Sequence, residues 1–328
     1  YHGYCEIPQD DWLKEENILA LTFTEKAAEE METRVASELD TGGYGCTIST
    51  FHSFAERILQ DHGVEVGLPV SFKLVDEKGA WVLLKKNIEK LGLKHFRPLG
   101  NPAKFLNVLL RHFSLCKQSL ISPAEYLDYA QNTNLDFDSK KNPQSLDLEK
   151  LNELANAYHV YNRLLLENSV LDFDDLIYYA CDLFSKSLHI KEKYILRYKC
   201  VCIDEFQDTN WAQYSFIKMI VGEQTEFAAV GDDDQSIYKF RGASLSNILH
   251  FKKDFPNAEE VVLSDNFRSA QPILDAAYSL IRNNDPERLE VKLRLNKKLI
   301  ANSSGLGAIA AGEFFDDSDE AEYIANQI

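Results

Sequence analysis

The sequence predicts an α/β protein in which a mostly parallel sheet is interrupted by a long helical insertion. Short apolar runs alternate with helix-forming segments before residue 76 and again after residue 195. Strands that alternate with helices favour a parallel sheet with helices on both faces. Between residues 76 and 195, Leu, Phe and Tyr instead recur at three- and four-residue spacing, which is typical of helices. We therefore expect a helical domain inserted into a sheet domain.

Two strand–helix pairs form the first part of the predicted sheet domain. NILALTFT (17–24) is typical of a buried strand, and EKAAEEMETRVASEL (25–39) is rich in strong helix formers. CTISTF (46–51) predicts a second strand that ends in polar residues. The next helix is expected from Ser53 to His62.

Turn-forming residues divide the helical insertion, and strands return after it. RPLGNP (97–102), LISP (120–123) and the polar stretch 131–145 separate its helices. KCVCI (199–203) and EFAAV (226–230) predict further strands, so the first sheet domain continues behind the insertion.

A second α/β unit is expected towards the end of the chain. EEVVLS (259–264) predicts its first strand and GAIAAGEFF (307–315) its next one. The predicted division places the first sheet domain at 1–75 and 196–258, the inserted helical domain at 76–195, and the start of a second sheet domain at 259–328.

Composition limits the classes of protein to which the chain can belong. Its 328 residues suffice for two or three cores, and 45% hydrophobic with 27% charged residues is ordinary for a globular protein. No apolar run approaches the roughly 18 residues of a membrane span. The six cysteines lack metal-ligand spacing, which argues against a disulfide framework or a zinc site. We expect a cytoplasmic protein with no membrane partner.

The net charge of −17 counts mildly against nucleic-acid binding, because phosphate contacts need Lys and Arg. Acidic stretches such as DDSDEAE (316–322) can, however, be solvated surface far from a binding groove. Nucleic acid therefore stays open as a partner.

Two acidic clusters follow directly behind two of the predicted strands. Asp204 and Glu205 end the run VCIDE, and Asp232 to Gln235 follow the run EFAAV. Ligands of parallel sheets bind at the carboxyl ends of the strands. A magnesium ion that carries nucleotide phosphates would offset the crowded carboxylates. The alternative for Asp-Glu alone is a cap on the next helix, but the two clusters together favour the nucleotide.

The clusters also resemble the motifs of a known family. IDEFQDTN resembles motif II, and GDDDQSIYKFRGA motif III, of the UvrD/Rep/PcrA-like superfamily 1 DNA helicases. The resemblance implies a RecA-like, parallel-sheet P-loop NTPase domain with an inserted helical domain, followed by the start of a second RecA-like domain. Further similar segments occur in the family's order: LALTFTEKAAEEM (19–31) for motif Ia, TISTFHSFAERIL (47–59) for Ib, LDFDDLI (171–177) where the insertion returns, and LSDNFRSAQPIL (263–274) for motif IV.

The resemblance implies ATP and Mg²⁺ as cofactors and assigns a role to each matching residue. Asp204 would coordinate magnesium, and Glu205 would be the catalytic base for the water that attacks the γ-phosphate. Gln235 would sense the γ-phosphate, and Arg268 would reach it from the second sheet domain and stabilise developing charge. Phe267 stands where the family usually has Tyr and would stack on the adenine.

The resemblance also implies a groove for single-stranded DNA. Phe240 stands where UvrD and PcrA carry Trp, a platform on which bases stack without regard to sequence. The family commonly has Asn in motif Ia where this chain has Glu25. The other groove residues would be Phe23, Thr24, Thr50, Phe51 and His52, with Tyr238 and Arg241 in support.

A DNA motor follows from these implied sites. ATP would bind between the two sheet domains, and its hydrolysis would drive movement along single-stranded DNA from 3′ to 5′. The expected partners are single-stranded DNA, junctions between single- and double-stranded DNA, and DNA-repair proteins. Unwinding would serve DNA repair or replication.

One expected motif is absent from the sequence. No G-x-x-x-x-G-K-[ST] loop occurs, and the glycines at 42, 43 and 45 lack the lysine. In the family this loop precedes motif Ia, so it would lie before Tyr1, while motifs V and VI would lie beyond Ile328. We expect an internal piece of a longer helicase that alone hydrolyses ATP poorly.

Two alternatives remain. One is a RecB/AddA-type motor fused to a nuclease, whose motif III more often has GDPKQ where this chain has GDDDQ. The other is a helicase-like scaffold that binds DNA without turnover. The intact Asp204, Glu205, Gln235 and Arg268 argue against the scaffold.

Overall fold

The structure consists of two units that are described separately. The computed structural model describes residues 13–38, 45–135, 145–236, 245–303, 305 and 307–328. Contacts divide the chain into Tyr1–Lys253 and Asp254–Ile328. The four-part domain division derived from the sequence stays a prediction. No helix within the described residues is both long and apolar enough to cross a membrane.

The first unit is built on a parallel four-stranded sheet, as predicted. Its strand order is β2-β1-β5-β6, and each neighbouring pair runs parallel. Leu21 lies opposite Ile203, which lies opposite Ala229, so three strands end at the same edge. The strands are β1 (Ile18–Thr22), β2 (Thr47–Thr50), β5 (Cys200–Ile203) and β6 (Glu226–Ala229).

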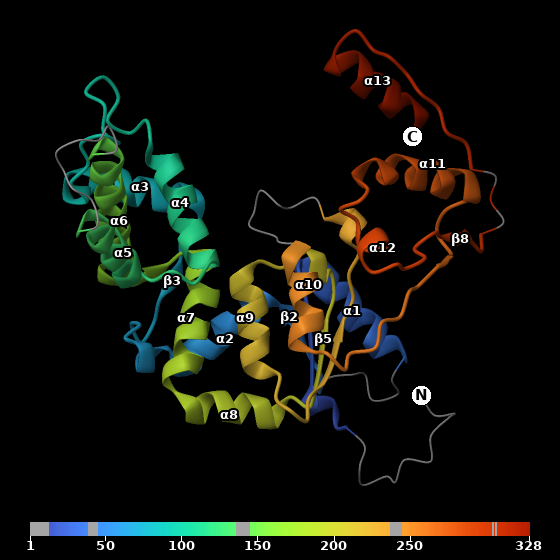
Figure 1. Cartoon of the computed structure of the whole chain (residues 1–328), viewed down its shortest axis with the longest axis horizontal. Coiled ribbons are helices and arrows are strands. Elements are labelled where there is room, and N and C mark those ends of the chain that lie inside the picture. Colours follow the sequence, from blue (N-terminus) through green and yellow to red (C-terminus); the bar gives the residue numbers. More distant parts are fainter. Residues whose placement is uncertain (1–12, 39–44, 136–144, 237–244, 304, 306) are drawn as a thin grey trace. The chain divides into compact units, whose positions relative to one another are not determined.

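Helices cover both faces of this sheet (Figure 1). Leu19, Leu21, Val201 and Ile203 are buried on one face. The opposite face is covered by α1 (Glu25–Glu38), through Ala28 against Ala20 and Ile48. The first face packs against α2 (Phe51–His62), α7 (Phe173–Lys186), α8 (Leu188–Arg197), α9 (Trp211–Ile220) and α10 (Leu245–Asp254).

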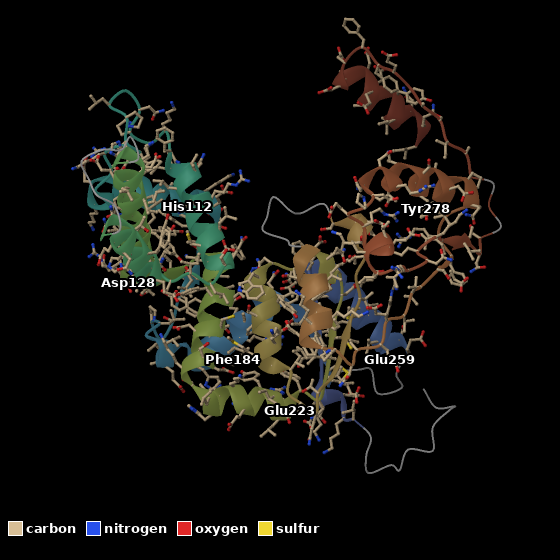
Figure 2. All side chains as sticks on the ribbon, viewed as in Figure 1. His112, Asp128, Phe184, Glu223, Glu259 and Tyr278 are labelled. Carbon is tan, nitrogen blue, oxygen red and sulfur yellow. The ribbon has the colours of Figure 1, made fainter. Side chains whose placement is uncertain are left out.

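Aromatic stacking joins the helices on the first face. Phe184 of α7, labelled in Figure 2, stacks on Phe216 of α9 with ring centroids 5.7 Å apart.

Helix α2 begins at Phe51, two residues earlier than predicted. It does so because Thr50 acts as its N-cap, where the hydroxyl oxygen accepts a hydrogen bond from the backbone N–H of Ser53 at 3.1 Å.

The helical insertion has a core of its own. Leu84, Leu109, Phe113 and Tyr158 are buried together there. Although α7 and most of α8 fall within the predicted range 76–195, their apolar residues belong to the sheet core. The elements of the insertion are α3 (Glu77–Lys86), α4 (Leu106–Gln118), α5 (Pro123–Leu135) and α6 (Ser145–Glu167), with parallel β3 (Lys73–Leu74) and β4 (Val170–Leu171) where the chain enters and leaves.

The second unit is smaller, and two of its predicted strands are wrong. Residues 259–264 and 307–315 form no strand. Val261, Leu263 and Ile309 are exposed, so these runs have no buried face of the kind that stabilises a strand. The elements present are parallel β7 (Asp265–Asn266) and β8 (Ile300–Ala301), with α11 (Gln271–Ile281), α12 (Leu289–Lys292) and α13 (Asp317–Gln327).

Short 3-10 turns connect many of these elements. They are η2 (Glu15–Asn17), η3 (Gly63–Val66), η4 (Ile88–Leu91), η5 (Phe206–Asp208), η6 (Asp233–Gln235) and η8 (Arg282–Asn284). Two of them, η5 and η6, follow directly behind β5 and β6 and shape the candidate site.

Candidate nucleotide site and nucleic-acid face

Asp204 and Glu205 lie at the carboxyl end of β5, where the sheet holds their backbone. The N–H of Asp204 donates to the carbonyl oxygen of Leu21 at 2.9 Å, and the N–H of Phe206 donates to that of Val230 at 2.9 Å. Glu205 between them is left-handed, with φ 52° and ψ 43°. Such a backbone is uncommon for a residue with a side chain and costs about 1 kcal/mol or more. The flanking hydrogen bonds hold this turn in place.

Gln207 connects this turn to the segment behind β6, and sequence reasoning missed it. Its amide nitrogen donates to Oε2 of Glu205 at 2.6 Å, and its amide oxygen accepts from the N–H of Asp232 at 3.0 Å. The side chain is only 1% exposed. A Cβ on Gly231 would lie 2.9 Å from the Gln207 amide oxygen and 3.2 Å from its backbone nitrogen. Only glycine allows this approach without displacing a neighbour.

Three consecutive carboxylates follow β6. Oxygen atoms of Asp232, Asp233 and Asp234 lie within 4.8 Å of one another. The carboxylate of Asp232 accepts from the N–H of Asp234 at 3.2 Å and from the side-chain amide of Gln235 at 2.9 Å. Gln235 is therefore held by the same aspartate that contacts Gln207.

A further acid, Asp208, lies buried close behind Glu205 in the chain. Burial, and then the charge of Glu205, raises the pKa of Asp208. Its buried Oδ1 has no hydrogen-bond partner among the described residues. Carboxylate oxygens are the ligands that Mg²⁺ prefers, and an added cation would offset this excess of negative charge. The residues present therefore fit a magnesium ion.

Several predicted DNA contacts gather where β2 ends and α2 begins. Hydroxyl groups of Thr50 and Ser53 donate to the same oxygen of Glu25, at 2.8 and 2.7 Å. The Ser53 and then the Thr50 hydrogen bond lower the pKa of Glu25. The ionised carboxylate of Glu25 therefore accepts both hydrogen bonds and holds this corner, the end of β2 and the start of α2, in place. The neighbouring Thr24 is exposed.

The aromatic residues of this corner differ in burial. Phe51 is 1% exposed and belongs to the sheet core, and Phe23 is half-buried. Burial lowers the pKa of His52, so its ring is neutral at neutral pH. The ring meets Phe173 of α7 edge-on, with centroids 6.3 Å apart. Phe173 is 52% exposed, which gives this corner an aromatic surface that sequence reasoning did not single out.

Comparison with known families identifies the family of the chain. Residues 7–256 match the family model described as the UvrD/REP helicase N-terminal domain. The chain belongs to the UvrD/REP helicase family. This confirms the resemblance found in the motifs and the RecA-like fold class that it implied.

Individual UvrD/REP relatives are similar along nearly the whole chain. It is 34% identical over 328 residues to the ATP-dependent DNA helicase PcrA of Leuconostoc citreum, covering 100% of this chain and 40% of that relative. It is 36% identical over 329 residues to the DNA helicase II of Rickettsia typhi, covering 99% of this chain and 45% of that relative. The chain thus spans less than half the length of these relatives.

The second unit carries two of the predicted nucleotide residues. Phe267 and Arg268 belong to the second unit and are exposed. Asn266 Oδ1 accepts from the N–H groups of Arg268 and Ser269, at 3.0 and 2.8 Å, and fixes their backbone. The predicted DNA residues Tyr238, Phe240 and Arg241 lie outside the described residues.

Proposed function

We propose that this chain forms the nucleotide- and DNA-binding core of an ATP-dependent DNA helicase. The observation that carries the proposal is the turn behind β5, where Glu205, next to Asp204, is connected to the loop of Gln235 through Gln207. The matched family model and the names of the relatives support the same activity.

At the nucleotide, each residue has a distinct task. Asp204 would hold Mg²⁺, which when bound neutralises charge on the phosphates. Glu205 would take a proton from the attacking water. Gln235 and Arg268 would contact the γ-phosphate, and Phe267 would stack on the adenine.

At the DNA, Phe23, Thr24, Thr50, Phe51 and His52 would line the groove for a single strand, with Tyr238 and Arg241 in support. Thr50 and Phe51 are buried, so they would hold the exposed Thr24 and the partly exposed His52 in place. Phe240 would supply the stacking platform, which suits a motor because stacking is independent of sequence. The exposed ring of Phe173 beside His52 would extend that aromatic surface. A motor of this kind would move 3′ to 5′ and act at junctions of single- and double-stranded DNA, in repair or replication with DNA-repair proteins.

Strand separation tests the proposal. The complete product of the gene that encodes this chain is mixed with duplexes that carry either a 3′ or a 5′ single-stranded tail. We expect ATP- and Mg²⁺-dependent unwinding of the 3′-tailed duplex, abolished by Glu205→Gln. Unwinding of only the 5′-tailed duplex would overturn the direction, and unwinding unaffected by Glu205→Gln would overturn the assigned base.

A further inference from the structure

Three hydrogen bonds in series connect the proposed catalytic base to the proposed γ-phosphate sensor. Glu205 accepts from the Gln207 amide at 2.6 Å, and Gln207 accepts from the backbone N–H of Asp232 at 3.0 Å. Asp232 in turn accepts from the side-chain amide of Gln235 at 2.9 Å. The series passes from the turn behind β5 to the turn behind β6.

We infer that Gln207 is a positioning residue that ties the orientation of Glu205 to the place of the loop that carries Gln235. The inference rests on the proposed function, because it assigns Gln207 a task in the same ATP hydrolysis. Gln207 itself acts only through Glu205 and Asp232.

The chemistry of an amide suits this place. One end must donate to a carboxylate and the other must accept from a backbone N–H, and a neutral amide offers both. A rotation of the amide by half a turn would lose both hydrogen bonds, so the position of Asp232 fixes the group that contacts Glu205. With Oε2 of Glu205 occupied by Gln207, the carboxylate is held in one orientation.

Burial makes the Gln207 part of the connection stiff. Gln207 is 1% exposed, and Gly231 approaches it too closely for any side chain larger than hydrogen. A displacement of the Asp232 backbone therefore reaches Gln207 rather than being absorbed by solvent. Misplacement of a catalytic group by about 1 Å can cost about a hundredfold in rate.

The test is Gln207→Glu in the complete gene product, with Gln213→Glu as the matched control. Glutamate has nearly the same shape but cannot donate to Glu205 when ionised. Gln213 is also buried, and its side-chain oxygen accepts from the N–H of Asn210 in a helix cap, which glutamate preserves. We expect kcat for DNA-stimulated ATP hydrolysis to fall about tenfold or more for Gln207→Glu, with KM for ATP within about threefold. The control should retain both values.

A second variant and a double-mutant cycle separate positioning from mere loop stability. Gln207→Asn keeps the amide but is too short to reach both partners, so it should also lower kcat without a new charge. Gln207→Asn combined with Gln235→Ala should lose less than the product of the two single losses, because both act through one connection. Unchanged kcat in both Gln207 variants would overturn the inference. So would a loss in the double variant equal to the product of the two single losses. In either case an active parent would still support the proposed function. A parent without turnover would overturn both.

Discussion

The ammonium group of Lys117 lies 2.6 Å from a carboxylate oxygen of Asp172 and has no exposed surface. A second carboxylate, Asp175, lies 2.7 Å from the same nitrogen. The hydroxyl of Tyr161 donates to Asp172 at 2.8 Å. Lys117 comes from α4 of the helical insertion and both acids from the start of α7, which packs in the sheet core. The buried cluster therefore joins the two cores.

Replacing Lys117 with methionine is expected to destabilise the protein strongly. The substitution leaves Asp172 and Asp175 buried without a counter-charge, which typically costs about 3–5 kcal/mol. Urea unfolding measures the change. Lys150→Met is the control, because that exposed pair with Asp147 at 3.3 Å should contribute less than about 1 kcal/mol. Equal stability of the two variants would contradict the role of the cluster.

The same cluster predicts how stability depends on pH. Burial, and then the charge of Asp172, raises the pKa of Asp175 to about 7. An unfolded aspartate ionises near about 3.9. Between these values folded Asp175 holds a proton that the unfolded chain has released, so the contribution of Asp175 to the free energy of unfolding should fall as pH rises from 4 to 7 and level off above.

Asp175→Asn tests this dependence, since asparagine does not titrate. The variant should lose much of the decrease in the free energy of unfolding with rising pH. Burial also raises the pKa of Asp174, which therefore supplies part of the decrease that remains. Asp128→Asn, at an exposed acid of α5, is the control. Urea unfolding between pH 5 and pH 8 measures the slope, and an unchanged slope in Asp175→Asn would refute the assignment.

Replacing Glu25 with glutamine is expected to strengthen DNA binding. The ionised carboxylate of Glu25 lies in the proposed DNA corner, where it repels phosphate. Glu25→Gln keeps an acceptor for Thr50 and Ser53 but removes the charge, so the affinity for single-stranded DNA should rise about twofold to fivefold, as for an exposed charge pair. Fluorescence anisotropy measures Kd. The control Glu29→Gln removes the same charge from an exposed position of α1, and an equal gain there would exclude a local effect.

Replacing Gly231 with alanine is expected to lower activity without a large loss of stability. The added methyl of Gly231→Ala would push against Gln207 and displace the group that orients Glu205. We expect DNA-stimulated kcat to fall about tenfold. Gly100→Ala, where a Cβ meets nothing within 4 Å, should leave kcat unchanged. A fully active Gly231→Ala variant would show that the close approach is dispensable.

The parallel sheet could be predicted because strand and helix patterns alternate and its strands end in the motif residues. The spacing of apolar residues in the sequence could not show which core a helix joins. Helices α7 and α8 have the same apolar spacing as the insertion, yet Phe184 and Tyr194 pack in the sheet core. An apolar run alone also does not make a strand, as residues 259–264 show, because a strand needs a neighbour and a buried face.

The acids of the candidate site could be predicted from the sequence, but the hydrogen bonds that connect them could not. Asp204 and Glu205 follow a strand at the position where ligands bind, so their placement followed from the sequence. Gln207 carries no comparable signal, because a glutamine two residues behind Glu205 does not show in the sequence which groups it contacts. Its role depends on the register of β5 and β6, which sets Asp232 beside it.

ATP hydrolysis by the complete gene product, with and without single-stranded DNA, is the most direct test of the account. It is measured beside the Glu205→Gln variant at saturating ATP and Mg²⁺. We predict strong stimulation by DNA and its loss in Glu205→Gln. Absence of turnover in the parent, or full turnover in Glu205→Gln, would contradict the proposal that the turn behind β5 hydrolyses ATP.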